Sequence, residues 1–218
     1  MGVINFSIPE SLVLNLVKNN NVKNFIETGT YKGNSSFWAA KHFDNVFTIE
    51  LNKELYEETS SRKDAPKNIT FLQGNSKVVL PELVNTLDGQ SIFWLDGHWC
   101  MGAGGKEDEC PLMNELMAIS KTKDSIILID DARCFLGPLP PPHNANDWPR
   151  IDEIFSLIHN YFPDYTSTIV EDVIVAVPAS VKQNLDDYWQ NNYNRIYSLK
   201  NAIGKYSKIS VLKQVLKG

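Results

Sequence analysis

The chain is expected to fold as an α/β protein, because short β-rich runs alternate with helical stretches along most of its length. Two of these runs, at 91–95 and 125–129, are continuously apolar, as strands of a parallel sheet are when helices cover both faces. After Pro163, two adjoining runs at 165–170 and 172–177 predict an antiparallel hairpin at one edge of the sheet. The fold class is therefore a doubly wound, Rossmann-like sheet, mostly parallel, with helices on both faces and a terminal antiparallel β-hairpin.

The expected elements follow one another without a linker or an internal repeat. A first helix is predicted over 9–20 from the apolar spacing of Leu12, Val13, Leu16 and Val17. The strands are expected at 24–28, 46–50, 69–73, 91–95 and 125–129, and the helices that follow them at 34–42, 53–61, 77–86, 111–119 and 151–161. The pattern over 181–190 is helical and becomes ambiguous beyond that range.

We expect a single domain over 1–218. It consists of a sheet region flanked by an N-terminal helical segment at 1–21, a lid-like loop at 133–149 and a C-terminal helical extension at 178–218. The loop contains GPLPPPHNANDWP, and an irregular segment of this length in a compact domain is usually a lid or a binding loop.

The composition is that of an ordinary globular protein. Among 218 residues, 43% are hydrophobic and the net charge is −5, which excludes an intrinsically disordered chain. The chain lacks the start of a signal peptide, three cysteines are an odd number for a disulfide framework, and no run of about 18 apolar residues could span a membrane. We therefore expect a cytoplasmic protein without a membrane partner and, since no basic stripe stands out, without a nucleic-acid partner. A homodimer is compatible with these features.

A glycine-bearing turn follows the first predicted strand, in the sequence ETGTYKGNSS that starts at Glu27. Gly29 and Gly33 let the backbone approach a ligand closely, and the helix that follows presents unpaired N–H groups there. The alternative is a tight turn between strand and helix that contacts no ligand. Glu50 ends the second strand, where a carboxylate can accept both ribose hydroxyls of an adenosine. A solvated helix cap is the alternative for Glu50.

Three carboxylates follow the fourth and fifth predicted strands: Asp96, Asp130 and Asp131. These strands are neighbours in a doubly wound sheet, so their C-terminal ends face one crevice. Carboxylates gathered there would repel one another unless a cation lay between them, and oxygen ligands suit Mg²⁺ or a similar hard ion. The alternative is that one aspartate caps a helix and the others are solvated. A competing hypothesis is a zinc site, although its spacing matches no usual zinc pattern; the ligands would be His98, Cys100, Cys110 and Cys134.

The segments FIETGTYKGNSS, TIEL, QGNS, WLDGHW and ILIDDAR occur in this order between residues 22 and 135. In order and spacing they resemble the class I S-adenosylmethionine-dependent methyltransferases, and within that class the cation-dependent O-methyltransferases of the catechol and macrocin types. The resemblance implies two cofactors, S-adenosylmethionine and Mg²⁺ or another divalent cation, with Asp96, Asp130 and Asp131 as metal ligands. The residues that it places around S-adenosylmethionine are Glu27, Gly29, Thr30, Tyr31, Gly33, Ser35, Glu50, Asn75, Ser76 and Asp96.

His98 and Asp96 are the expected catalytic residues. A histidine beside a metal ligand can take the proton from a substrate hydroxyl, because its pKa lies near neutrality. The alternative is a histidine that packs on Trp99 and only shapes the loop. The chain departs from the catechol type at Cys100, where that family has a lysine shortly after its His-Trp pair, so a catechol substrate is not expected.

The acceptor is expected to contact the 99–110 and 133–149 loops, and the glycines of 101–105 add flexibility there. Arg133 could clamp an anionic group of the acceptor, such as a phosphate, or it could neutralise Asp130 and Asp131. Trp99 and Trp148 are the aromatic candidates for contact with the acceptor.

The expected function is transfer of a methyl group from S-adenosylmethionine to a hydroxyl of a sugar, or of a glycan or natural-product intermediate, with help from a divalent cation. N-methylation on the same fold is the nearest alternative. A nicotinamide-dependent Rossmann oxidoreductase is disfavoured, because G-x-G-x-x-G is missing and the aspartates have no role there. The aspartates and His98 together also disfavour a non-catalytic cofactor-binding subunit.

Overall fold

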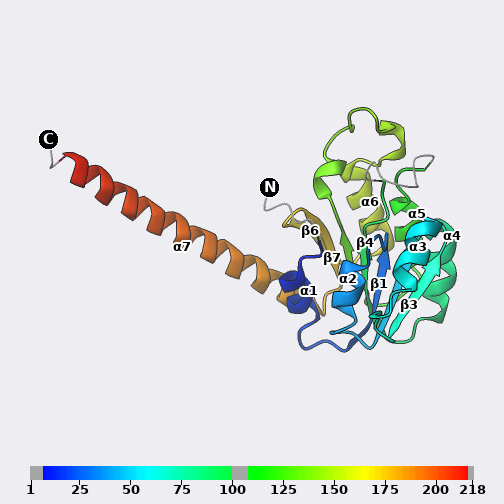
Figure 1. The fold of residues 1–218 in the computed structure, drawn as a ribbon. Helices are drawn as coiled ribbons and strands as arrows, with labels where there is room; N and C mark the ends of the chain where they lie inside the picture. Colours follow the sequence, from blue (N-terminus) through cyan, green and yellow to red (C-terminus); the bar gives the residue numbers. More distant parts are fainter. Residues whose placement is uncertain (1–6, 100–107, 216–218) are drawn as a thin grey trace.

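The computed structural model describes residues 7–99 and 108–215, with side chains described up to residue 201. Its centre is a seven-stranded sheet in the order β3-β2-β1-β4-β5-β7-β6 (Figure 1). Strands β1 to β5 are parallel, whereas β7 runs antiparallel to both of its neighbours, β5 and β6. The strands are β1 (Val22–Thr28), β2 (Asn45–Glu50), β3 (Ile69–Gln73), β4 (Gln90–Leu95), β5 (Ile126–Ile129), β6 (Thr166–Val170) and β7 (Val173–Val177).

Helices cover both faces of this sheet. The helices are α1 (Glu10–Val17), α2 (Asn34–Ala39), α3 (Lys53–Ser60), α4 (Ser76–Leu83), α5 (Leu112–Ile119), α6 (Ile151–Tyr161) and α7 (Lys182–Val215). Helices α4, α5 and α6 share one hydrophobic cluster with the sheet, and α1, α2 and the start of α7 share another. Within β4, Phe93 and Leu95 belong to the first cluster and Ile92 and Trp94 to the second, as the two-residue period of a strand requires. The predicted fold class is confirmed.

The elements begin and end close to their predicted boundaries. The helix expected over 34–42 ends at Ala39, and the one expected over 77–86 divides into α4 and a short 3₁₀ helix at Val84–Thr86. The 133–149 loop contains 3₁₀ turns at Ala132–Phe135 and Ala145–Asp147. None of the described helices is both long enough and apolar enough to cross a membrane.

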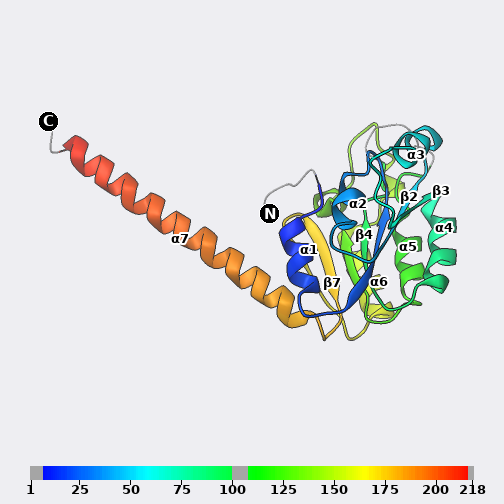
Figure 2. The same cartoon turned by 60° about the horizontal axis from the view of Figure 1, so that its bottom comes forward.

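Helix α7 lies in the segment expected to be a C-terminal helical extension, and it is longer than the sequence pattern made clear. Its helical pattern was clear only over 181–190, whereas the helix continues to Val215. Figures 1 and 2 show it projecting away from the rest of the molecule.

The sheet brings the ends of β1, β4 and β5 together at one edge. The main-chain N–H of Asp96 donates to the carbonyl of Thr28, and that of Asp130 donates to the carbonyl of Leu95, each at 3.1 Å. The strand order reverses between β1 and β4, and such a reversal is where an open α/β sheet forms its ligand crevice. The candidate site is therefore at this edge.

Candidate active site

The turn after β1 passes very close to the segment that follows β4. Gly29 has a φ of +86°, and a Cβ atom there would lie 2.2 Å from the carbonyl oxygen of Asp96. Gly33, with a φ of +75°, directly precedes α2 in the left-handed conformation. Both positions therefore require glycine. The tight turn expected from the sequence is present, and its contact with a cofactor stays a prediction.

Glu27 is a buried carboxyl at the end of β1. Its Oε2 atom accepts hydrogen bonds from the hydroxyls of Ser36 and Thr48, the latter at 2.7 Å, and Thr48 is bonded in turn to Thr30 at 2.6 Å. Burial raises the pKa of Glu27 to about 7, although these hydrogen bonds and one from the half-buried Ser35 act in the opposite direction. A positively charged ligand nearby would favour the ionised form of this carboxyl.

Glu50 presents a fixed carboxylate at the end of β2. Its two oxygens accept hydrogen bonds from the main-chain N–H groups of Tyr31 and Asn52, each at 2.8 Å. The Tyr31 side chain is 59% exposed, so the main chain of the turn rather than the phenol ring holds Glu50. Asn52 caps α3 and Glu50 is buried, which excludes the solvated helix cap. Each carboxylate oxygen keeps a lone pair for another donor, such as a ribose hydroxyl.

Asn75 and Ser76, which the resemblance places around S-adenosylmethionine on its adenine side, have structural partners at the start of α4. The Asn75 side chain accepts the main-chain N–H of Lys77 at 2.9 Å and so caps the helix. Ser76 is buried, and its hydroxyl lies close enough to Glu115 of α5 to lower the pKa of that carboxyl. Their contact with an adenine stays a prediction.

Asp96 and Asp130 form the acidic centre of the crevice. Burial raises the pKa of Asp96 well above its usual range, and the nearby charges of Asp130 and Glu27 raise it further. Burial and the charge of Asp131 raise the pKa of Asp130 to about 7. With Glu50, the crevice thus gathers carboxyls from four strand ends.

Asp131 is different, because two basic side chains flank it. One carboxylate oxygen lies 3.1 Å from Nε2 of His98, and the other lies 2.6 Å from Nη1 of Arg133. Burial by itself would raise the pKa of Asp131, but these two partners lower it below its usual value. Arg133 also pairs with Asp172 in the β6–β7 turn, and its main-chain N–H donates to the same carboxylate at 3.0 Å. Of the two roles considered for Arg133, this geometry favours neutralisation of the aspartates, with Asp131 and Asp172 as its direct partners.

The three aspartates do not fit a cation site in this arrangement. Both oxygens of Asp131 are engaged by His98 and Arg133, and Oδ1 of Asp130 accepts the main-chain N–H of Asp131 at 2.7 Å. Within 7–99 and 108–215, no group of three or more His, Cys, Asp or Glu side chains is placed to hold a metal ion. We therefore derive no catalytic step through a cation, and cation dependence stays a prediction from the sequence.

The zinc hypothesis gains no support from the described cysteines. Cys100 and the 101–105 loop lie outside the described residues. Burial raises the pKa of the Cys110 thiol to about 11, which disfavours the thiolate form that binds zinc.

Glu109 fastens the lid-like loop to the segment between β4 and α5. Its buried carboxylate accepts hydrogen bonds from Nδ1 of His143 at 3.0 Å, the main-chain N–H of Asn144 at 2.9 Å and the indole N–H of Trp148 at 2.7 Å. Although burial acts in the opposite direction, these donors lower the pKa of Glu109. Sequence analysis missed Glu109, since its partners lie more than thirty residues away along the chain.

Trp148 does not have the position expected of an acceptor platform. It is only 7% exposed, and its ring centroid lies 5.3 Å from that of His98 and 5.7 Å from that of Phe135. Trp148 thus packs edge-to-face against the imidazole of His98. Trp99 is half-buried, with its ring 5.2 Å from that of His143, and its contact with an acceptor stays a prediction.

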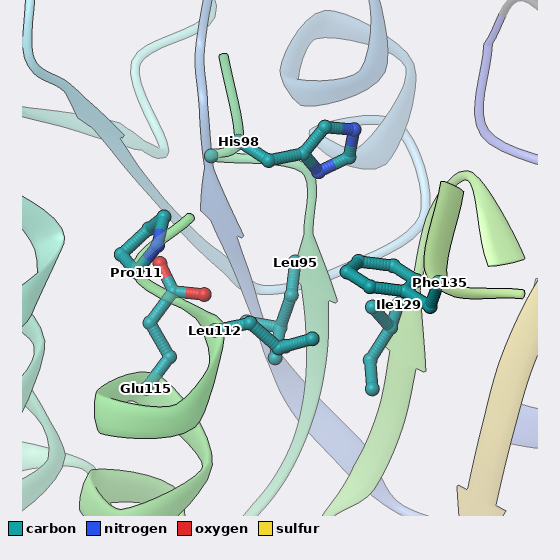
Figure 3. A pocket seen from close by; sticks show the side chains of 8 residues that line it. Leu95, His98, Pro111, Leu112, Glu115, Ile129 and Phe135 are labelled. Atoms are coloured by element: carbon teal, nitrogen blue, oxygen red, sulfur yellow. The ribbon is translucent and has the colours of Figure 1, made fainter. Parts of the chain in front are cut away.

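Glu115 is a second residue that sequence analysis missed. It is buried on α5, and Figure 3 shows its carboxylate directed towards Pro111 in a narrow cavity that His98 also lines. Burial raises its pKa against the effect of nearby hydroxyls. Oε1 of Glu115 and Oγ1 of Thr28 both lie beside Gly97, and the Thr28 hydroxyl is one of those that act to lower the pKa of Glu115. Acidic residues are common in the first turn of a helix, so nothing in the sequence singles out Glu115. Its burial, which only the structure shows, distinguishes it.

Comparison with solved structures extends the description of the fold. A candidate caffeoyl-CoA O-methyltransferase from Staphylococcus aureus superposes with a TM-score of 0.53 and 17% identity, over 81% of this chain and 86% of that protein. A candidate O-methyltransferase from Klebsiella pneumoniae has a TM-score of 0.51 and 16% identity, over 80% of this chain and 82% of that protein. Precorrin-6y C5,15-methyltransferase from Geobacter metallireducens has a TM-score of 0.50 and 11% identity, over 81% of this chain and 90% of that protein.

The chain has a methyltransferase fold. No protein-family model and no curated protein sequence matches it. At these low identities the likeness to solved methyltransferases concerns the arrangement of the elements, so the chemistry must be argued from the residues of the crevice.

Proposed function

We propose that the protein transfers a methyl group from S-adenosylmethionine to a hydroxyl group of a small-molecule or glycan acceptor. The observation that carries this proposal is the acidic crevice at the strand-order reversal of a methyltransferase fold, with Glu27, Glu50, Asp96 and Asp130 at four strand ends. S-adenosylmethionine carries a positive charge, which favours the ionised form of these carboxyls as it binds. The negative pyrophosphate of a nicotinamide cofactor would favour their protonated form and gain no such attraction.

The crevice offers groups that fit each part of the cofactor. Glu27 and the backbone at Gly29 fit the methionine end, and Glu50 has lone pairs for the ribose hydroxyls. When bound, S-adenosylmethionine supplies an activated methyl group, so positioning and deprotonation are the tasks left to the protein.

His98 is the residue proposed to accept the proton of the acceptor hydroxyl. Its hydrogen bond with Asp131 fixes the orientation of the imidazole and stabilises the imidazolium that proton transfer creates. Arg133 and Asp172 hold Asp131 in place from the other side. Trp148 packs against the imidazole and limits its access to water.

Two of the similar structures are described as O-methyltransferases, which supports oxygen over nitrogen as the accepting atom. A sugar or natural-product hydroxyl is the acceptor class that the sequence favours.

The test is methyl transfer from radiolabelled S-adenosylmethionine to a panel of sugars, glycans and polyols, with amines as comparison acceptors. We expect label in hydroxyl acceptors, and a loss of turnover of about 10²–10⁴-fold in His98→Ala, the range for a missing general base. His159→Ala, at an exposed position of α6, is the matched control and should retain full activity. Label in amines alone would contradict the proposal.

A parallel assay after exhaustive chelation tests the cation separately. Loss of activity would confirm the prediction made from the sequence. Full activity would mean that Asp96, Asp130 and Asp131 act without a metal ion.

A further inference from the structure

Helix α7 leaves the body of the protein within its first turns. Tyr188 is buried, and its hydroxyl is bonded to Glu171 at 2.8 Å and to Ser11 at 3.0 Å. Asn192 donates to Glu171 at 2.9 Å. From residue 193 to residue 201 every side chain is exposed. A helix of 34 residues is about 50 Å long, and Figures 1 and 2 show most of that length projecting beyond the other elements.

The projecting part carries a stripe of large apolar side chains, which we call the aromatic stripe: Trp189, Tyr193, Ile196 and Tyr197. These positions follow the i, i+4, i+7, i+8 spacing of one helix face. Their exposed fractions are 51%, 55%, 56% and 57%. The rings of Trp189 and Tyr193 stack at 5.3 Å, and those of Tyr193 and Tyr197 at 6.2 Å. A contiguous exposed patch of this kind marks an interaction surface.

The same part of the helix is uniformly basic. Beyond Asp187 the sequence contains no acidic residue, and its basic residues are Arg195, Lys200, Lys205, Lys208, Lys213 and Lys217. The whole chain has a net charge of −5, so positive charge is concentrated in the projecting segment and the remainder is acidic. Two copies of this helix packed together would repel one another, because neither offers carboxylates to the other.

We propose that the projecting part of α7 binds the surface of a membrane that contains anionic phospholipids. Trp and Tyr rings favour the headgroup region of a bilayer, and Lys and Arg beside them are attracted to anionic lipids. The helix would lie on the bilayer without crossing it, in keeping with its low apolar content. The sequence-based expectation of no membrane partner considered only spanning segments. This proposal is independent of the proposed function.

The experiment is co-sedimentation of the full chain with vesicles of phosphatidylcholine, with and without phosphatidylglycerol. We expect binding only to vesicles that contain phosphatidylglycerol, and a decrease in binding as salt is added. The partition coefficient of the double variant Arg195→Gln with Lys200→Gln should be about 30-fold lower, because each basic residue near an anionic surface usually contributes about a fivefold gain in binding. Tyr193→Ser with Tyr197→Ser should lose about tenfold or more, because two half-exposed rings no longer enter the interface.

The matched control is Asn191→Ala with Asn194→Ala, at exposed positions of the same turns but outside the aromatic stripe. It should bind within about twofold of the unmodified chain. The proposal is overturned if phosphatidylglycerol has no effect on binding, or if the tyrosine double variant binds as the unmodified chain does. It is also overturned if the stripe serves self-association instead. In that case light scattering would show a dimer that the tyrosine variant abolishes, without binding to vesicles. Binding of a single-stranded oligonucleotide without binding to vesicles would overturn the proposal in favour of a nucleic-acid partner.

Discussion

Glu27→Gln is expected to stabilise the fold and to weaken the cofactor site at the same time. Burial raises the pKa of Glu27 from 4.5 to about 7. Between these pH values the folded state keeps a proton that the unfolded state releases, so the free energy of unfolding falls as pH rises and levels off above about 7. Since one pKa unit corresponds to about 1.4 kcal/mol, the ionised carboxyl lowers the free energy of unfolding by about 3 kcal/mol once the pH is above about 7.

Glutamine has the same shape as glutamate and can accept the hydrogen bonds of Ser36 and Thr48, but it cannot ionise. Above neutral pH, the free energy of unfolding of the variant should therefore be higher than that of the unmodified chain by up to about 3 kcal/mol. Its free energy of unfolding should also not fall between pH 4.5 and about 7 on account of this residue. Its affinity for S-adenosylmethionine should fall about tenfold to hundredfold, the loss expected when a hydrogen-bonding group gives up its charge.

The assay combines urea unfolding, followed by circular dichroism across and above the interval between the two pKa values, with calorimetric titration of S-adenosylmethionine. Glu58→Gln, an exposed carboxylate on α3, is the matched control and should change the free energy of unfolding by less than about 0.5 kcal/mol. If Glu27→Gln is less stable than the unmodified chain above neutral pH, burial does not destabilise the ionised Glu27. If the variant binds the cofactor equally well, Glu27 is not part of the cofactor site.

Other variants separate the cofactor, the loop and the proton acceptor. Glu50→Ala should weaken S-adenosylmethionine binding by about 1–3 kcal/mol in calorimetry, because the ribose loses its acceptor. Glu109→Gln should raise the Michaelis constant for the acceptor and leave the cofactor dissociation constant unchanged, because it weakens the attachment of the 133–149 loop; an effect on the cofactor alone would contradict this assignment. Asp131→Asn should lower turnover by about 10²–10⁴-fold without changing cofactor affinity, because His98 loses its orienting carboxylate. Unchanged steady-state turnover would remove Asp131 from the catalytic group.

The sheet could be predicted from the sequence because its central strands are buried on both faces. Apolar runs such as Ile126–Ile129 leave few alternatives to a parallel strand. The C-terminal segment was expected to be helical, but its pattern was ambiguous beyond residue 190, because a projecting helix has no buried face to impose one apolar period along its length. The aromatic stripe itself follows the spacing of one helix face over 189–197.

The positions of the crevice residues followed from topology, but their partners did not. Asp96 and Asp130 come together because neighbouring parallel strands end at the same edge. The pairing of Arg133 with Asp172 joins residues 39 apart in sequence, across a hairpin whose register the sequence does not specify. Trp148 was expected to be open to an acceptor, but its ring contacts with His98 and Phe135 and its hydrogen bond to Glu109 bury it. Long-range polar pairs of this kind leave no periodic signal.

The central claim is that the acidic crevice binds a cationic methyl donor. The measurement that tests it most directly is isothermal titration calorimetry of the full chain with S-adenosylmethionine and, separately, with NAD. We expect a dissociation constant of about 1 μM or lower for S-adenosylmethionine, equivalent to about −8 kcal/mol, and no measurable heat from NAD, whose pyrophosphate is disfavoured by the neighbouring carboxyls. Tight binding of NAD together with no binding of S-adenosylmethionine would contradict both the proposed cofactor and the electrostatic reasoning behind it.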